Sequence, residues 1–323
     1  MKRDNKSSLN RCHHLLNHCN QSDKSGGMAL ILTLLVVSIL AVLVLEFNYL
    51  MRVDSTIAGN YRDSLKALYL AKSGVNFGIL LLRRDDLAYD ALTEDWAASK
   101  LPVAEAEGMI LFEITDENRK IDINKIIAGG KIDEKLKRLF ELLGIPEELI
   151  YVIADWGDPD SEIRFHGAED DYYSGLPNPY HCKNGPLDTV TELLLLKDFD
   201  DDTFYGKGSA RDPLSSYLTV YGDGRININT APLIILQTLS DDIDRPLAEA
   251  IVDYRDEKPF KSIEDIKEVV GDRIYNEISE TLTVRSNFFS IQAQGLSGES
   301  SKNIRAVIER GSKDLRIRYW HVG

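Results

Sequence analysis

Cysteine is scarce in this chain, which has three cysteines in 323 residues. Cys12 and Cys19 lie close together before a long apolar segment, and Cys182 stands alone in the remainder. If the part before the apolar segment is removed, Cys182 has no second cysteine to pair with. The sequence therefore predicts no intramolecular disulfide, and it excludes the disulfide framework that holds many small exported domains together.

Positive charge is also in short supply, because 38 lysines and arginines face 52 acidic residues and give a net charge of −14. Such a surface repels the phosphates of nucleic acids and attracts divalent cations. The motifs G-x-S-x-G, H-E-x-x-H and the P-loop are missing from the sequence. We therefore expect neither an enzyme nor a nucleic-acid-binding protein. A zinc hydrolase site at His166 and His181 remains an open alternative.

No charged residue occurs from Met28 to Leu45, a run of eighteen residues in which Thr33 and Ser38 are the polar interruptions. As an α-helix this run is about 27 Å long, which is enough to cross the hydrocarbon core of a bilayer. Apolar residues then recur at the helical period as far as Leu82. The sequence predicts one helix over residues 28–84, which is transmembrane over residues 28–45 and amphipathic beyond them.

The start of this helix allows three interpretations. A cleaved secretory signal has a shorter apolar region and a small-x-small cleavage site, which this sequence lacks. A plain signal anchor does not need an amphipathic second part. In the third interpretation Gly26 and Gly27 form a processing site, and the apolar run stays on the mature protein. Residues 1–27 carry five basic and two acidic side chains, so we expect this end to stay in the cytoplasm and the rest to be exported.

The segment Lys24-Ser-Gly-Gly27, followed by Met28-Ala-Leu and the apolar helix, resembles the leader of type IV pilins and type II secretion pseudopilins. The resemblance implies that a prepilin peptidase removes residues 1–27 and methylates the new amino terminus at Met28. Most pilins carry a glutamate at the fifth residue after the cut, where this chain has Leu32. A carboxylate in hydrocarbon needs a neutralising partner. In lacking it, the chain resembles the general secretion pathway protein K family.

Strand patterns follow the long helix and return at the other end of the chain. A hairpin is predicted from residues 109–115 and 119–124, and four more strands from residues 282–284, 288–294, 304–309 and 315–319. A long helix with a small antiparallel sheet is the pilin-like architecture, in the α+β class. We expect residues 85–124 and 281–323 to form one pilin-like domain, which an inserted domain over residues 125–280 interrupts.

The inserted part contains an internal repeat. Lys120-Ile-Asp-Ile-Asn124 resembles Arg225-Ile-Asn-Ile-Asn229, and both copies continue through helical patterns to Leu-Thr-Val, at residues 218–220 and 282–284. The second copy has the pattern of a helix-hairpin-helix unit, but its hairpin lacks Gly-x-Gly and carries three carboxylates at residues 240–244. We therefore expect a packing role rather than phosphate binding. The inserted domain is predicted to be all-α, of the helix-hairpin-helix or SAM-like type.

Carboxylates crowd one loop of the first copy. Calcium takes oxygen ligands from flexible backbone, although a solvated acidic surface explains the same density. The candidate ligands are Asp155, Asp158, Asp160, Glu162, Glu169, Asp170 and Asp171. The elements D-W-x-D-x-D, G-A-E-D-x-x-Y and I-N-T-A-P again resemble general secretion pathway protein K, and the resemblance implies that the inserted domain binds calcium. Asp198, Asp200 and Asp202 form a second candidate group, which acids at a helix start explain as well.

The resemblance implies a minor pseudopilin at the tip of the type II secretion pseudopilus, which starts assembly and caps the filament for export of folded proteins across the outer membrane. The partners it implies are the I and J minor pseudopilins, the major pseudopilin and the prepilin peptidase. We expect partner contacts along residues 53–82, with Leu68 and Val75 among them. The protein would cross the bacterial inner membrane once, with its C-terminal domain in the periplasm. A minor type IV pilin and a membrane-anchored calcium-binding adhesin are the alternatives.

Overall fold

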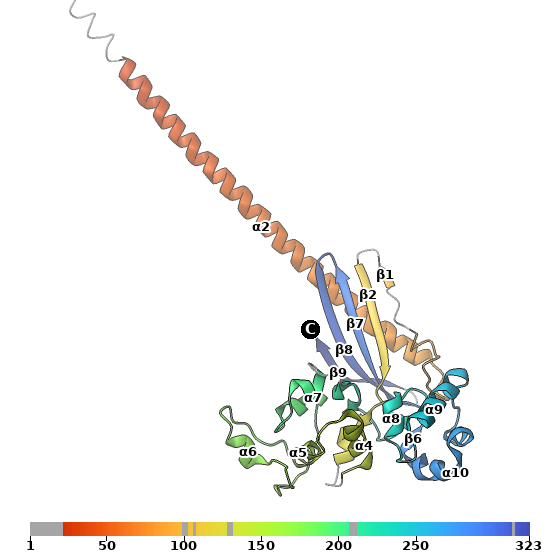
Figure 1. The fold of residues 1–323 in the computed structure, drawn as a ribbon. Helices are drawn as coiled ribbons and strands as arrows, with labels where there is room; N and C mark the ends of the chain where they lie inside the picture. The colour runs from red at the N-terminus through yellow and green to blue at the C-terminus, as the bar shows by residue number, and fades with distance from the viewer. Residues whose placement is uncertain (1–21, 99–102, 106–107, 128–131, 207–211, 312–313) are drawn as a thin grey trace, which may run out of the picture. The chain divides into compact units, whose positions relative to one another are not determined.

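A computed structural model describes residues 22–98, 103–105, 108–127, 132–206, 212–311 and 314–323. The chain divides into two compact units, residues 1–63 and residues 64–323. One long helix, α2 (Ser22–Arg84), runs through both units (Figure 1). Residues 1–21, which make up most of the predicted leader, lie outside the described residues.

In the first unit, α2 exposes its apolar side chains from Met28 onward. Both polar side chains of the apolar run bond back to the helix: the Thr33 hydroxyl donates to the Leu30 carbonyl at 2.8 Å, and the Ser38 hydroxyl to the Leu34 carbonyl at 2.7 Å. These hydroxyls therefore have hydrogen-bond partners without water. A helix in hydrocarbon requires this, because no water is available there. By length and composition α2 is able to cross a membrane.

The helix extends further than predicted at its start. It begins at Ser22 rather than at Met28, and it ends at Arg84 as expected. A glycine in a helix costs only about 1 kcal/mol relative to alanine. Gly26 and Gly27 therefore do not interrupt a helix that the following apolar residues favour.

The second unit contains a five-stranded antiparallel sheet in the order β1-β2-β7-β8-β9 (Figure 1). Its strands are β1 (Val103–Glu105), β2 (Gly108–Asp116), β7 (Phe288–Ser297), β8 (Ser300–Arg310) and β9 (Leu315–Val322). The part of α2 within this unit packs on one face of the sheet, and the two share one hydrophobic core. This is the helix-plus-sheet architecture that the sequence predicted.

Small residues bring α2 close to the sheet. A Cβ atom on Gly74 would lie 2.8 Å from Cγ2 of Ile110, and one on Gly295 would lie 2.0 Å from the carbonyl oxygen of Ala67. Neither position has room for a side chain. Val75 is fully buried in the same contact. It belongs to the chain's own core, so the prediction that it contacts a partner is wrong.

Most predicted strands of the sheet are confirmed, because residues 109–115, 288–294, 304–309 and 315–319 lie in β2, β7, β8 and β9. The hairpin predicted from residues 109–115 and 119–124 is wrong. Instead β3 (Ile121–Asp122) pairs in parallel with β4 (Leu218–Thr219). Likewise β6 (Leu282–Thr283) pairs in parallel with β5 (Ile226–Asn227), outside the five-stranded sheet.

Asn118 accounts for the missing hairpin. Its backbone carbonyl accepts a hydrogen bond from the Asn227 N–H at 2.9 Å, and its side-chain oxygen accepts one from the Asn287 N–H at 3.0 Å. Residues 116–118 are buried. The chain is therefore tied to distant segments at the point where a surface turn was expected, and it leaves the sheet there.

The region between β2 and β7 is mostly helical and has a hydrophobic core of its own. Its α-helices are α3 (Ile123–Ile127), α4 (Glu134–Leu143), α5 (Glu148–Gly157), α6 (Asp170–Ser174), α7 (Asp201–Tyr205), α8 (Leu233–Gln237), α9 (Arg245–Glu257) and α10 (Lys267–Ile278). The 3-10 helices are η2 (Val190–Leu195), η3 (Leu214–Ser216), η4 (Ile263–Ile266) and η5 (Ser279–Thr281). The four short strands β3 to β6 are a departure from the all-α prediction. The domain boundaries at residues 125 and 280 stay a prediction.

The predicted repeat is confirmed by equivalent contacts in its two copies. Asn124 and Leu187 exchange two hydrogen bonds, from Nδ2 to the carbonyl at 2.9 Å and from the N–H to Oδ1 at 2.8 Å. Asn229 and Phe260 exchange the same two bonds, both at 2.9 Å. Each copy is also closed by its own parallel strand pair. One structural unit therefore occurs twice, and the first copy contains the acidic loop.

Candidate metal centre

The acidic loop begins at the end of α5 and leads into α6. Asp155 lies in the last turn of α5, and Asp158 is the residue that caps it. Trp156 packs edge-on against the rings of Tyr173 and Tyr180. Since α5 is buried along most of its length, these contacts direct the first two carboxylates into the protein interior.

Three carboxylates of the loop converge. Asp158, Asp160 and Glu169 each place one oxygen within 4.8 Å of the other two. Asp158 and Glu169 are both 2% exposed, whereas Asp160 lies on the surface. Carboxylates at such distances repel one another when they are ionised. The group is therefore open to a cation from the side of Asp160.

One guanidinium enters the group from the loop itself. Arg164 Nη1 donates to Asp155 Oδ1 at 2.7 Å and also to Asp158 Oδ2. The Arg164 N–H donates to Asp155 Oδ2 at 3.2 Å. Gly167 lies against the same carboxylate, and a Cβ atom there would be 1.8 Å from Asp155 Oδ2. Asp155 is thus satisfied by Arg164, and burial, opposed by these hydrogen bonds, raises its pKa.

Glu169 is the least satisfied member. Among the described residues, neither of its carboxylate oxygens has a hydrogen-bond partner of ordinary geometry, and neither does Asp158 Oδ1. The Cys182 thiol, a weak donor, lies close to Glu169. Burial, and then the charges of Asp155 and Asp158, raise the pKa of Glu169 to about 7. Buried oxygens without partners are rare in folded proteins, and these are of the kind that calcium binds.

The other predicted ligands of this loop lie apart from the group. Asp170 accepts a hydrogen bond from the Cys182 N–H at 2.9 Å and lies 3.0 Å from His181 Nδ1, and these contacts lower its pKa. Asp171 and Glu162 are exposed. The groups of metal-ligating side chains found among the described residues contain no histidine. The zinc hydrolase alternative thus has no support from the arrangement of the described residues.

The second predicted group is not assembled. Asp200 is the N-cap of α7, and its Oδ1 accepts a hydrogen bond from the Thr203 N–H at 2.8 Å, which lowers its pKa. Asp202 lies in the first turn of α7, and Asp198 is exposed. The described residues do not bring these three carboxylates together as they do Asp158 and Glu169. The interpretation as acids at a helix start is confirmed for Asp200.

Comparison with known proteins gives two matching family models, both described as type II secretion system protein K. They match residues 120–206 and residues 226–285, which correspond to the two copies of the repeat. The type II secretion system protein K of Pectobacterium carotovorum subsp. carotovorum is 24% identical over 246 residues, which cover 69% of this chain and 73% of that protein. The protein of the same name from Aeromonas hydrophila is 23% identical over 328 residues, covering 91% and 95%.

A solved structure has the same fold. It is a chain of the GspK-GspI-GspJ complex from the type 2 secretion system of enterotoxigenic Escherichia coli. The likeness has a TM-score of 0.68 and 19% sequence identity, and it covers 84% of this chain and 99% of that one. The chain is therefore similar to type II secretion system protein K in both copies of the repeat and over most of its length. It is therefore a minor pseudopilin of type II secretion, a structural component of the apparatus.

The predicted processing site is a second candidate feature. Gly27 and Met28 lie within α2, and a Cβ atom on Gly27 would meet nothing within 4 Å. Met28 and Leu32 are exposed on the helix. Leu32 leaves the helix without a charge at the position where most pilins have a glutamate. Cleavage after Gly27 and methylation at Met28 stay predictions.

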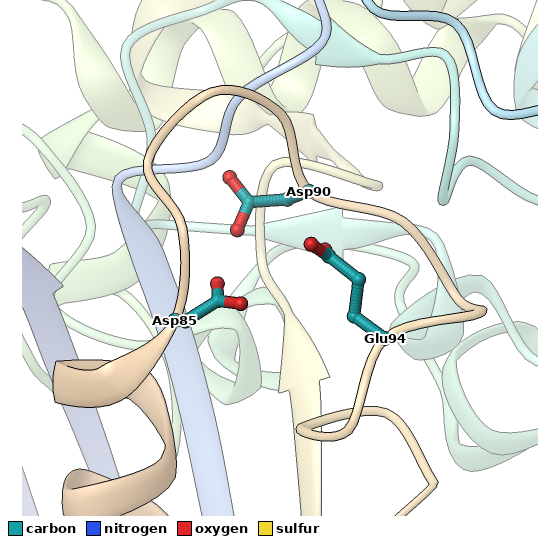
Figure 2. A group of neighbouring side chains, drawn as sticks. All are labelled: Asp85, Asp90 and Glu94. Carbon is teal, nitrogen blue, oxygen red and sulfur yellow. The ribbon is translucent and has the colours of Figure 1, made fainter.

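The sequence analysis missed a further acidic group, which follows α2. Asp85, Asp90 and Glu94 point toward one another (Figure 2), with one oxygen of each within 4.8 Å of the others. Each has a partner in the protein: Arg310 Nη1 donates to Asp85 Oδ2 at 2.8 Å, Arg310 Nη2 donates to Asp90, and the Ala91 N–H donates to Glu94 at 2.7 Å. This ion-pair network joins the end of α2 to β8. No local spacing predicts it, because Arg310 lies far away in the sequence.

Proposed function

We propose that this minor pseudopilin stands at the tip of the type II secretion pseudopilus, where it starts assembly and caps the filament. The observation that supports this most is the position of the helical region. β2 and β7 are neighbours in the sheet, yet the whole region between residues 116 and 288 is inserted between them. That region gives the protein bulk that a subunit inside a filament would have no space for.

The neutral N-terminal segment supports the same position. A glutamate in the apolar run would need a positive partner in hydrocarbon, and in pilins the amine of a neighbouring subunit is the expected partner. With Leu32 at that position the chain has no such requirement. A subunit without that contact fits the end of a filament.

The proposed partners are the I and J minor pseudopilins, since the related protein K was solved in a complex with GspI and GspJ. Contacts with them require apolar side chains that the chain's own sheet leaves free. In the second unit α2 exposes Tyr69, and Phe77 is half exposed because one edge of its ring packs against Phe112 of β2, whereas Val75 is covered. We therefore place the assembly surface on the side of α2 that carries Tyr69.

The proposed orientation puts the second unit in the periplasm. The apolar run follows a segment with a net charge of +3, from five basic and two acidic residues. Positive segments next to a membrane span stay in the cytoplasm. A prepilin peptidase acting after Gly27 would then release this segment and leave α2 in the inner membrane.

We further propose that calcium binds at Asp158, Asp160 and Glu169. A cation there would satisfy the partnerless oxygens of Glu169 and Asp158 and offset a negative charge that Arg164 alone does not balance. Bound calcium would supply charge neutralisation and join the loop to the end of α5. The protein's own residues supply the remaining order, through Arg164 on Asp155 and Trp156 among its tyrosines.

A thermal-melting titration of the full chain in detergent tests the calcium proposal. Calcium at a hundred times its dissociation constant should stabilise the protein by about 2.7 kcal/mol, and magnesium should act poorly because it keeps its waters. Glu169→Ala with Asp158→Ala should remove the response, whereas the surface pair Asp241→Ala with Asp242→Ala should retain it. A melting temperature that does not change with calcium would show that the loop is a solvated acidic surface.

A secretion assay tests the function itself. Deleting the gene that encodes this chain should leave the exported proteins of the type II pathway in the periplasm. Expressing the full chain in the deletion strain should restore their release. A variant with Tyr69→Asp and Phe77→Asp should fail to restore it while still reaching the membrane. The matched control is Leu142→Asp with Leu195→Asp, two exposed apolar side chains of the helical region, away from α2. Normal secretion without the chain would refute the proposal.

A further inference from the structure

The free edge of β9 differs from the other edge of the sheet. At one side the sheet ends with β1, which has 3 residues, and at the other with β9, which has 8. Among the described residues no strand pairs with the outer side of β9. A long edge strand is a template for another strand, and proteins usually shorten, bulge or charge such edges.

The register of β8 and β9 shows which backbone groups are free. Asn303 and Gly323 exchange both hydrogen bonds, at 3.2 and 2.9 Å. Residues in an antiparallel pair alternate between bonded and non-bonded positions. Ile304 opposite Val322 and Ala306 opposite Trp320 are therefore non-bonded pairs. The N–H and carbonyl groups of Trp320 and Val322 point away from β8, toward the free edge.

Apolar side chains occupy one side of β9. Ile304, Ala306 and Ile308 belong to the core beneath α2, and opposite residues of paired strands project to the same side of a sheet. Their partners on β9 are Val322, Trp320 and Ile317. These three are 42%, 38% and 54% exposed, so the apolar row continues past the part of the sheet that α2 covers.

Basic side chains occupy the other side of β9. Arg316 lies opposite Glu309, and Arg318 donates to Glu309 from the same side. His321 lies opposite Arg305. Arg316 and Arg318 keep 65% and 49% of their side-chain surface exposed. The strand is thus basic and amphipathic, on a chain whose net charge is −14.

We propose that β9 binds an extended segment of a partner protein as an added strand, with apolar residues on the α2 side alternating with acidic residues on the other. The free groups of Trp320 and Val322 would pair with its backbone, the apolar row would bury its apolar side chains, and Arg316 and Arg318 would face its carboxylates. A second copy of this chain fits poorly, because two basic strands would repel each other. The proposal does not depend on the identity of the partner.

Two synthetic peptides test the proposal on the full chain in detergent. One alternates valine with glutamate, and the control alternates valine with lysine. The glutamate peptide should bind at least about tenfold more tightly, and the difference should shrink at high salt. It should also slow amide hydrogen exchange at Trp320 and Val322, and leave Tyr319 and His321, which already bond to β8, unchanged.

Matched variants separate strand addition from loose adsorption. Trp320→Pro removes one free N–H and should abolish binding, whereas Trp320→Ala keeps the N–H and should bind more weakly but measurably. Arg316→Glu with Arg318→Glu leaves the backbone hydrogen bonds unchanged and should make the chain bind the lysine peptide more tightly than the glutamate peptide. This double variant tests the proposal even if Trp320→Pro does not fold. Equal binding of both peptides, unchanged exchange at Trp320 and Val322, or protection of these amides by self-association without peptide would overturn the proposal.

Discussion

Glu169 shows at the scale of one residue why the acidic loop depends on its ionic surroundings. Burial and two neighbouring carboxylates raise its pKa from 4.5 to about 7. Between these values the folded protein holds a proton that the unfolded chain has released. Stability should therefore fall as pH rises through this window and level off above it. The check is chemical denaturation without calcium across this pH range.

Two variants make that measurement specific. Glu169→Gln cannot ionise, so it should lose this slope and should be more stable than the wild type above pH 7 when calcium is absent. Glu162→Gln, at an exposed carboxylate of the same loop, should keep the wild-type slope. A slope that survives in Glu169→Gln would mean that another group is responsible.

Arg310 is the second residue whose charge should affect the stability of the fold. It is 4% exposed in its side chain and lies between Asp85 and Asp90. Arg310→Gln would leave these buried carboxylates without a positive charge, and we expect a loss of about 3 kcal/mol in the free energy of unfolding at neutral pH. The loss should become smaller as the pH is lowered, because burial already raises the pKa of both carboxyls and protonation removes the charges that Arg310 neutralises.

Arg316→Gln is the control for Arg310. Arg316 pairs with Asp314 at 3.0 Å but is 65% exposed, so its loss should cost less than about 1 kcal/mol. Urea unfolding of both variants in detergent gives the comparison. Equal effects of the two substitutions would show that the buried network does not stabilise the junction of α2 and β8.

The sequence predicted the chemistry of the acidic loop better than its geometry. The density of carboxylates was visible, and Asp158, Asp160 and Glu169 were among the candidates. The sequence did not show that Asp170 and Asp171 lie apart from these three carboxylates. This separation depends on Cys182 and His181, which contact Asp170 from the far end of the loop. Composition predicts the charge of a segment, whereas the directions in which its side chains point depend on contacts with distant residues.

At the scale of the elements, the two equivalent asparagines give a matched experiment. Asn229 is buried and Asn124 is half-buried, and each holds a backbone segment with two hydrogen bonds. Replacing Asn229 by alanine should cost about 2 kcal/mol of stability, because two buried backbone groups lose their partners. Asn124→Ala should cost less, since water reaches its site. Denaturation midpoints that rank the two in the opposite order would contradict this account.

The elements also show where local pattern suffices. Alternation predicted β2, β7, β8 and β9, because apolar residues recur on one face of each strand, and in β2, β7 and β8 that face lies on a core. At residues 119–124 and 282–284 it predicted strands but not their pairing, because β3 and β6 are two residues long and pair in parallel with distant segments outside the sheet. Both residues of each strand are buried, so the alternating pattern there does not mark a solvent-exposed face of a hairpin. The repeat was visible nonetheless, since Asn124 and Asn229 must recur to make equivalent contacts.

At the scale of the whole molecule, we predict that the chain is cleaved next to its apolar run. Cleavage after Gly27 should leave Met28 as the amino terminus, and Gly27→Arg should block it by placing a charged side chain at the junction. Gly59→Ala, a change at another helical glycine where a Cβ atom would meet nothing within 4 Å, should leave cleavage intact. Amino-terminal sequencing of the membrane-extracted protein reads the outcome, and a terminus at Met1 or beyond Leu45 would exclude the pseudopilin processing route.

The central claim is that this chain ends a filament rather than extending it. Native mass spectrometry of the chain extracted together with the I and J minor pseudopilins tests it most directly. We predict a complex with one copy of each subunit, which loses mass in steps of calcium when a chelator is added. Long homopolymers of this chain, or repeated copies of it within one assembly, would contradict the claim.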